Sequence, residues 1–396
     1  MPPRPSVVEI FLVALRLGCV SFGGPVAHLA YFRREYVEQR RWLDEAQYAD
    51  LVALCQFLPG PASSQTGFGI GYLQRGLAGG IAAWLGFTLP SALLMIGFAY
   101  GVAALADFSA AGWLRGLKTA AVAVVAQAVW AMGRGLCPDW PRRLLAVAVA
   151  AFVLWLPSAW NQMAVIALGA LAGACLPAGA PGAGRAPGAA PAGSGRKQGA
   201  ACLAIFLVLL LALPALARLT PPGWADTFDR FYRVGSLVFG GGHVVLPLLE
   251  REVVAPGWLT HDQFLAGYGA VQAVPGPLFT FSAYLGAVMS HGPGGWTGGL
   301  WALTAIFLPA LLLVAGVLPF WQAVRSRPRL RSAMQGANAA VVGVLLAAFW
   351  QPVCVTGVAD ARSGGLAVTA AVALFSGRVP VWAVVAAAAL LGAAFL

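Results

Sequence analysis

Two arginines stand inside long apolar runs, where a charge usually serves a function. Arg16 opens the sequence R-L-G-C-V-S-F-G-G, and Arg233 opens the similar R-V-G-S-L-V-F-G-G 217 residues later. A charge within membrane hydrocarbon costs at least ~2.5–3.5 kcal/mol on insertion scales. A guanidinium at such a depth suits an anion, although Arg16 can also reach an interface or pair with Glu9.

Two breaks interrupt these apolar runs, and each break occurs twice. Glycine permits unusual turns, and proline removes a backbone donor, so a helix stops at each break. The half-helix that follows presents free N–H groups and about half a positive charge, which favours an anion. Paired interruptions in two halves of a chain point to a transport site, and packing kinks are the alternative. The break residues are Phe22, Gly23 and Gly24 with Phe239, Gly240 and Gly241, then Pro59, Gly60 and Pro61 with Pro275, Gly276 and Pro277.

Other polar residues accompany the breaks. Gln56 and Gln272 each precede a Pro-Gly-Pro turn by three residues and can donate or accept. Lys118 lies in an apolar run, and its repeat partner is Asn338. We predict that all these residues contribute to substrate binding. The candidates for ion coupling are Glu35 and Glu252, which match at the same offset, and Asp50, with His28 and His243 as weaker candidates.

The composition excludes most classes of protein. Of the 396 residues, 60% are hydrophobic and 10% are charged, whereas soluble domains carry about 25% charged residues. The net charge of +11 fits basic membrane loops, and we expect no nucleic acid partner. The six cysteines and four histidines lack metal-ligand spacing, so we expect no metal, no cofactor and no enzyme activity. Asp226-x-x-Asp229 is interpreted as helix capping.

The chain contains an internal duplication. Besides the breaks, Trp42-Leu43 returns as Trp258-Leu259, and 116–130 matches 336–350. A Gly/Pro/Ala-rich segment separates the copies and predicts a flexible linker. The predicted divisions are 1–177 (first repeat), 178–199 (linker), 200–218 (connecting transmembrane helix) and 219–396 (second repeat). Because the first apolar run of the chain is itself part of the repeat, we do not expect it to be a cleaved signal peptide.

The fold class is an all-α polytopic membrane protein. The expected spans are 10–31, 48–73, 77–104, 113–133, 143–156 and 162–177, then 201–217, then 227–249, 264–290, 297–320, 333–351, 364–376 and 380–396. Six crossings and one extra helix predict that the second repeat is inverted, with the N-terminus inside and the C-terminus outside.

The positive-inside rule agrees with this topology except at one segment. Arg33, Arg34, Arg40 and Arg41 would lie outside. Either the rule fails there or the first span is re-entrant.

The F-G-G break, the following Glu and Trp-Leu, the Q-x-x-P-G-P turn and the duplication together resemble the chromate ion transporter family, in its long two-domain form. The resemblance covers nearly the whole chain outside 178–199. It implies an inner-membrane protein that exports chromate, with sulfate as an analogue, and it implies a role for the break residues and both glutamines. The copies diverge after the glycines, so their roles need not be equal.

We therefore expect alternating access of an oxyanion at broken helices within the lipid bilayer. The alternatives are a sulfate or general oxyanion permease, a passive anion channel, and a membrane-embedded enzyme or scaffold. A homodimer is possible, because G-x-x-x-G pairs at Gly67/Gly71 and Gly169/Gly173 can serve contacts within one chain or between chains.

Overall fold

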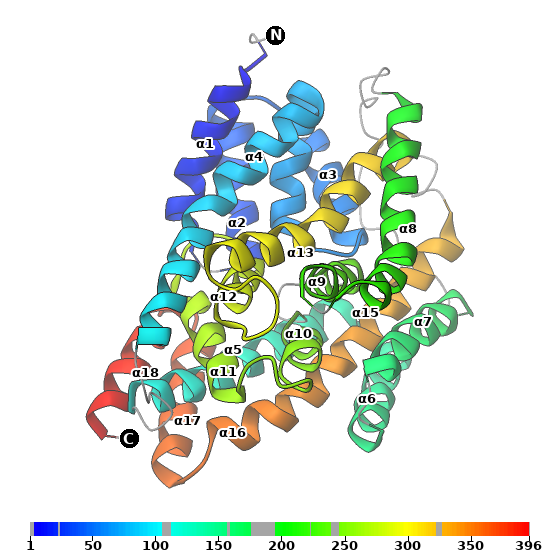
Figure 1. Cartoon of the computed structure of the whole chain (residues 1–396). Helices are drawn as coiled ribbons and strands as arrows, with labels where there is room; N and C mark the ends of the chain where they lie inside the picture. The colour runs from blue at the N-terminus through cyan, green and yellow to red at the C-terminus, as the bar shows by residue number, and fades with distance from the viewer. Residues whose placement is uncertain are drawn as a thin grey trace.

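The computed structural model describes residues 4–22, 24–104, 112–156, 159–175, 195–221, 223–238, 245–321 and 327–395. All regular structure in these residues is helical (Figure 1). The first copy of the repeat contains α1 (Val7–Val20), α2 (Gly24–Phe32), η1 (Arg33–Gln39), α3 (Glu45–Phe57), α4 (Ala62–Ala104), α5 (Gly112–Leu136), α6 (Trp140–Trp155) and α7 (Ala159–Cys175). After α8 (Arg196–Leu219), the second copy contains α9 (Trp224–Leu237), α10 (Val245–Val253), α11 (His261–Ala273), η3 (Leu278–Thr280), α12 (Phe281–Val288), α13 (Gly295–Val317), η4 (Leu318–Phe320), α15 (Pro328–Ala348), η5 (Phe349–Cys354), α16 (Val355–Gly357), α17 (Ala361–Phe375) and α18 (Val381–Phe395).

The first apolar run folds back on itself instead of crossing. α1 ends at Val20, and the chain returns through α2 and η1 until Arg40 Nη1 donates to Glu9 Oε1 over 2.8 Å, near the start of α1. Gly24 has a φ of +79°, a left-handed conformation that glycine adopts at little cost. The expected crossing at 10–31 is therefore wrong, because the break reverses the chain.

The second run of the first copy is also a helical hairpin. α3 leads inward from Trp42, and α4 returns from the Pro-Gly-Pro turn until Gln74 Nε2 donates to the Trp42 carbonyl over 2.8 Å. α4 then reverses again at Arg75 and Gly76, whose dihedral angles are not helical. Its two arms, 62–74 and 77–104, are antiparallel, and the expected crossing at 48–73 is wrong. The arm 77–104 spans roughly 40 Å at 1.5 Å per residue, enough to cross a bilayer.

The second copy repeats both hairpins. Arg230 on α9 contacts Glu252 on α10, with Nη1 3.1 Å from the Glu252 carbonyl. Ser290 N–H, after α12, donates to the Trp258 carbonyl, before α11, over 3.0 Å. Trp258 is the counterpart of Trp42, so the two closures are equivalent. The expected crossings at 227–249 and 264–290 are wrong for the same reason as their counterparts.

The re-entrant first hairpin removes the conflict with the positive-inside rule. Arg33 and Arg34 begin η1 at the end of the returning half of this hairpin, Arg40 and Arg41 follow it, and the Arg40–Glu9 contact places this segment near the start of α1. They therefore lie on the face that carries the N-terminus.

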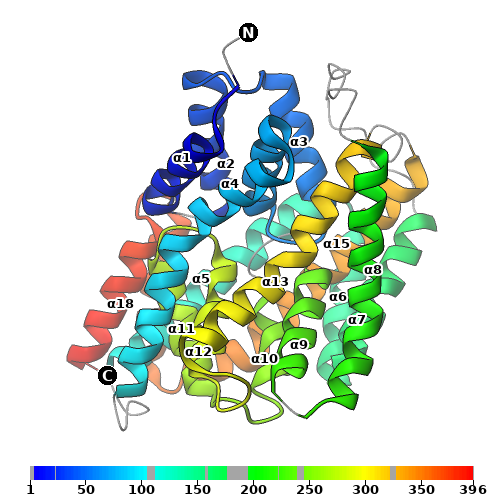
Figure 2. The same ribbon diagram turned by 45° about the horizontal axis from the view of Figure 1, so that its top comes forward.

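The two copies are inverted relative to each other. Trp296 N–H, at the start of α13, donates to Tyr100 Oη over 3.2 Å, near the end of α4. The arm 77–104 and its counterpart α13 therefore run antiparallel. The termini lie at opposite ends of the molecule (Figure 2). Two of the predicted crossings in each copy are hairpins. The number of crossings before the second copy therefore stays odd, and the predicted inversion holds.

The helices that follow the hairpins exchange partners between the copies. α5 packs against α17 and α18 of the second copy, and α15 packs against α6 and α7 of the first copy (Figure 1). A Cβ at Gly116 would collide with the Ala388 carbonyl, and a Cβ at Gly336 would collide with the Gly169 carbonyl. Gly71 likewise meets Gly79 across the α4 turn. The G-x-x-x-G glycines therefore make contacts within one chain.

The re-entrant topology predicts a labelling pattern. Single cysteines are placed at Arg4, at Glu38 and at its counterpart Ala255, all exposed, in a chain whose natural cysteines are replaced. We expect an impermeant maleimide to label Arg4→Cys and Glu38→Cys from one side of the membrane, and Ala255→Cys only from the other. Labelling of Glu38→Cys and Ala255→Cys from the same side would contradict the hairpins.

The glycine contact between α7 and α15 predicts a large loss of stability on substitution. Gly336→Val would force the two backbones apart, and overpacking costs about 1–3 kcal/mol or more. Gly133→Val is the matched control, because a Cβ at helical Gly133 meets nothing within 4 Å. Thermal unfolding in detergent should show a much lower midpoint for Gly336→Val; equal midpoints would refute the contact.

Candidate functional site

Two reciprocal hydrogen bonds join the hairpin tip of each copy to the helix break of the other. Gly60 N–H donates to the Val238 carbonyl over 2.6 Å, and Gly276 N–H donates to the Ser21 carbonyl over 2.9 Å. Gly60 matches Gly276 in the repeat, and Ser21 matches Val238. We call these four residues the junction. It lies where hairpins from opposite faces of the molecule meet.

The junction requires glycine at both tips. Gly60 has a φ of +125° and Gly276 a φ of +103°, in the left-handed region that side chains rarely adopt. A Cβ at Gly60 would lie 2.7 Å from Ala310 Cβ, and one at Gly276 would lie 2.7 Å from Ser91 Oγ. The flanking Pro59, Pro61 and Pro277 are buried, and Pro275 is partly buried.

His28 lies against the junction. Its Nε2 is 3.1 Å from the Ser21 carbonyl, and its Nδ1 is 3.3 Å from Ser63 Oγ. Because a carbonyl only accepts, Nε2 carries the hydrogen, and the neutral ring accepts from Ser63 at Nδ1. The Ser21 carbonyl thus receives both His28 and Gly276. His28 is 2% exposed, and its repeat counterpart is Val245, so only the first copy carries this ring.

Several buried polar atoms near the hairpin tips have no hydrogen-bond partner among the described residues. They point to a polar ligand, because buried polar groups are normally paired. Ser64 and Gln65 begin the return arm after Pro61, and Thr88 follows Phe87, whose carbonyl is 3.5 Å from a Cβ at Gly276. The atoms are Ser21 Oγ, Ser64 Oγ, Gln65 Oε1, Trp84 Nε1, Thr88 Oγ1 and Gln272 Nε2.

The sequence interpretation missed Ser21, Ser64, Gln65 and Thr88. The available signal was the polar run Ser63–Thr66, which follows the first Pro-Gly-Pro turn inside an otherwise apolar stretch. A helix start at Ala62 adds its partial positive charge on the same side of the turn. Hydroxyl and amide donors beside helix N-termini can bind an anion without a metal or cofactor.

The predicted arginines and glutamates pair with each other in both copies. Arg16 contacts Glu35 through Nη2 and Oε2, and Arg233 contacts Glu252 with Nη2 and Oε2 3.4 Å apart. Glu35 also accepts from Arg40 Nε over 2.7 Å. These ion pairs link the two halves of each first hairpin. The direct role of both arginines in substrate binding stays a prediction.

Lys118 lies at a separate polar cavity near the ends of α5 and α16. Its Nζ is 2.5 Å from Asp262 Oδ1. The cavity has a volume of about 250 Å³ and is also lined by Arg115, Thr119, Thr356 and Ser363. The Ser363 N–H, which Asp360 caps, lowers the pKa of the Asp360 carboxyl. Opposite charges are balanced there, so the cavity is less suited than the junction to a dianion.

The remaining predicted residues lie in different surroundings. Asp50 Oδ1 accepts from Trp321 Nε1 over 3.1 Å. Gln56 is exposed, whereas its counterpart Gln272 is partly buried. Phe22 packs on Trp382 with ring centroids 5.9 Å apart, and Asn338 Oδ1 is buried without a partner among the described residues. Gly23, Phe239, Gly240, Gly241 and His243 lie outside the described residues.

The interpretation of Asp226 and Asp229 as helix caps is wrong. α9 has Gly223 at its N-cap, without a side-chain cap. Asp226 contacts Arg230, and Asp229 contacts Arg233, each one turn later. Both acids therefore belong to an ion-pair network. In the described part of the chain, no group of three or more His, Cys, Asp or Glu side chains is placed to hold a metal ion.

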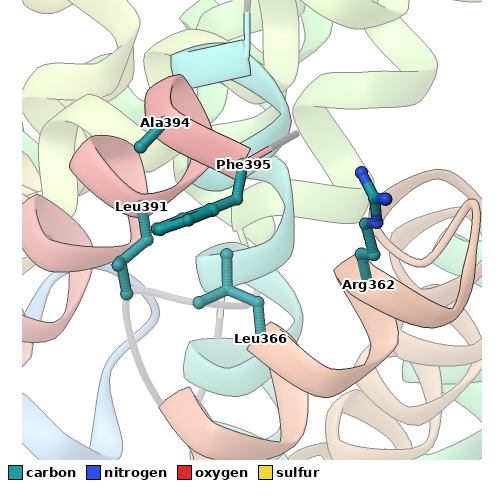
Figure 3. Close-up of a pocket in the computed structure, with 5 residues that line it drawn as sticks. All are labelled: Arg362, Leu366, Leu391, Ala394 and Phe395. Atoms are coloured by element: carbon teal, nitrogen blue, oxygen red, sulfur yellow. The ribbon is translucent and has the colours of Figure 1, made fainter.

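A further cavity lies between α17 and α18 and is distinct from the junction. Its volume is about 620 Å³, and Figure 3 shows Arg362 at one side of a wall formed by Leu366, Leu391, Ala394 and Phe395. It lies at the opposite end of α18 from the residue that packs on Phe22.

The ion pairs predict unequal effects of neutralising their members. Glu35→Gln removes a carboxylate that is 6% exposed and that joins Arg16 to Arg40, whose side chains are 59% and 30% exposed, and the lost hydrogen bonds between charged groups cost about 1.5–3 kcal/mol. Glu38→Gln is the control, because Glu38 is 50% exposed in its pair with Arg33 and such pairs contribute about 0–1 kcal/mol. Thermal unfolding should separate the two variants, and similar midpoints would show that the Glu35 network does not hold the hairpin.

Comparisons with known proteins agree with this architecture. The sequence model of the family described as "Chromate transporter" matches residues 8–174 and 225–393, one stretch in each copy. A chromate transport protein of Pseudomonas aeruginosa is 29% identical, over 87% of this chain and 80% of its own length. A probable chromate transport protein of Synechococcus elongatus is 26% identical, over 87% of this chain and 84% of its own. No solved structure matches the chain. With two family matches that together cover most of its length and fall on inverted copies of one helical unit, the chain belongs to the chromate transporter family.

Proposed function

We propose that this protein is a secondary transporter that exports chromate across the cell inner membrane, and that sulfate occupies the same site as an analogue. Membership of the family and the names of the relatives support chromate as the substrate. Chromate and sulfate are both tetrahedral dianions, so a site built from hydroxyl and amide donors accommodates either one.

The observation that carries the proposal is the junction with its unpartnered donors. Each hairpin tip is bonded to the other copy, and Ser64, Thr88 and Gln272 have polar atoms without partners among the described residues. A dianion at this place would accept from their hydroxyl and amide groups and from the N–H groups that begin the return helices. The break residues shape this site, and several weak contacts permit release.

The reciprocal geometry supports a mechanism of alternating access. In this mechanism, one hairpin pair would open toward the N-terminal face and its counterpart toward the opposite face. Separation of Gly60 from Val238, or of Gly276 from Ser21, would open a path from one face while the other bond stays closed. Rocking of inverted repeats around a fixed central site is a common mechanism of secondary transporters.

The basic residues support an orientation with the N-terminal face in the cytoplasm. Arg33, Arg34, Arg40 and Arg41 lie on that face, as argued above, and Arg75 reaches the Pro5 carbonyl there. Cytoplasmic loops carry the excess of arginine and lysine. Arg16, with 59% of its side chain exposed, would steer the dianion toward the site, while Glu35 limits how tightly this arginine binds it.

The test is transport of labelled chromate into everted membrane vesicles, with and without excess sulfate and with and without an uncoupler. We expect saturable, energised accumulation that sulfate inhibits. Gln272→Leu removes a buried donor, and loss of one hydrogen bond to a charged group, about 1.5–3 kcal/mol, should weaken apparent affinity by at least about tenfold.

Gln56→Leu is the matched comparison, because Gln56 is the exposed counterpart of Gln272. The expectation from the sequence that Gln56 binds substrate is replaced here by the proposal that its loss leaves transport unchanged. Equal effects of the two substitutions would move the site away from the second hairpin tip. Sulfate transport without chromate transport would indicate a sulfate permease. Flux that is linear with concentration and indifferent to the uncoupler would indicate a passive channel.

A further inference from the structure

We propose that Asp229 binds the proton that drives transport, so that the second repeat couples oxyanion export to proton movement and the first repeat does not. This inference rests on the proposed function for its cargo. The position of the proton site is inferred from a difference between the ion-pair networks of the two repeats.

The network of the first repeat is balanced. Arg40 contacts both Glu9 and Glu35, and Arg16 contacts Glu35. Two carboxylates therefore face two guanidiniums.

The network of the second repeat has one carboxylate in excess. Arg230 contacts Asp226 and Glu252, and Arg233 contacts Glu252 and Asp229. Arg233 matches Arg16, Glu252 matches Glu35, and Asp226 matches Glu9, each 217 residues apart. Asp229 has no acidic counterpart, because position 12 is an exposed leucine. Three carboxylates thus face two guanidiniums, with the His291 imidazole 3.2 Å from Asp226, and one proton on a carboxylate balances the carboxylates against the guanidiniums.

Asp229 carries a buried oxygen without a partner among the described residues. Its side chain is 5% exposed, Oδ2 accepts from Arg233 Nε over 3.1 Å, and Oδ1 has no partner among the described residues. Glu252 meets two arginines, and Asp226 meets Arg230 at 3.0 Å. A buried, incompletely paired carboxylate is unfavourable in its charged form, so Asp229 is the natural place for the proton. A metal cation is disfavoured there by the two adjacent guanidiniums.

Charged groups stand on several of the elements that pack against α9. α10 contributes Glu252, while its Glu250 pairs with His261 and interacts electrostatically with Arg251. The segment after α12 contributes His291, which stacks on Trp258 and lies 3.2 Å from Asp226. α13 has no charged residue, and the charges of α8 lie at its two ends. The groups that face the network are Asp226, Arg230, Arg233, Glu252 and His291.

A proton at Asp229 can influence the junction through α9. The helix runs from Trp224 to Leu237, and the next carbonyl, that of Val238, accepts the Gly60 N–H. Asp229 lies about 13 Å from that carbonyl along the helix axis, at 1.5 Å per residue. Protonation of Asp229 weakens its ion pair with Arg233, so that Arg233 pairs mainly with Glu252. The strength of the ion pair between α9 and α10 then differs between the two protonation states. The position of Val238, at the end of α9, would differ with it.

The test uses purified protein in liposomes, with chromate or sulfate flux and an internal pH-sensitive dye recorded together. In the unaltered protein, a pH gradient should drive oxyanion accumulation, and oxyanion flux should move protons. Asp229→Asn should abolish both effects while oxyanion exchange without a gradient persists. Asp229→Glu should restore coupling, because it restores a titratable group. His291→Gln should leave coupling intact.

Three results would overturn the proposal: coupling that survives in Asp229→Asn, coupling that is lost in His291→Gln instead, or oxyanion exchange in the unaltered protein without proton movement. The last result leaves the proposed function standing. If no oxyanion moves at all, the proposed function fails, and infrared difference spectra of the detergent-solubilised protein decide the proton site. A protonated-carboxyl band that titrates with pH, disappears in Asp229→Asn and persists in Asp226→Asn supports the site, and its absence from the unaltered protein refutes it.

Discussion

The need to satisfy backbone polar groups away from water governs this structure. Four helical segments end and restart inside the protein, and each break leaves N–H and carbonyl groups that lipid cannot pair. The chain meets this requirement by crossing its copies: Gly60 bonds to Val238, and Gly276 bonds to Ser21. The left-handed glycines follow from this arrangement, because a Cβ at Gly60 or Gly276 would collide with Ala310 or Ser91. The junction is therefore the place of greatest backbone constraint, and buried donors without a partner among the described residues lie near it.

The copies share a backbone plan but differ in their charged and titratable groups. His28 supports the junction from the first copy, where the second has Val245. Each ion-pair network contains one arginine that the repeat conserves and one that it does not. The second arginine is Arg40, after η1, in the first copy and Arg230, on α9, in the second. A similar exchange occurs near α5, where Lys118 pairs with Asp262 and its counterpart Asn338 has a buried unpaired oxygen. The duplicated fold thus brings two chemically different halves together at the junction.

The sequence predicted the repeat, the breaks, the extra helix and the inversion, because each depends on local composition or on parity. It did not predict that the first two runs of each copy are hairpins. An apolar run of about twenty residues has the length of a crossing whether or not it reverses at its centre, and only the misplaced arginines near Arg40 signalled the difference. The partners of Arg16 and Arg233 were also out of reach, since Glu35 and Glu252 meet them only after the chain has folded back. Ser64 belongs to the polar run Ser63–Thr66 that follows the first Pro-Gly-Pro turn, but Thr88 carries no distinguishing local pattern, and only its burial without a partner makes it a candidate.

The exchange of helices between the copies has a consequence for biosynthesis. The glycine face of α5 meets α18, and that of α15 meets α7, so the first copy cannot bury its own surfaces when it leaves the ribosome. Its α5 must wait in the membrane until the final helix of the chain is inserted, some 250 residues later. At the usual synthesis rate of ~5–20 residues per second, that interval is on the order of ten seconds to a minute. Through this period the glycine face of α5 has no protein partner from the second copy, so it must remain in contact with lipid or with the insertion machinery.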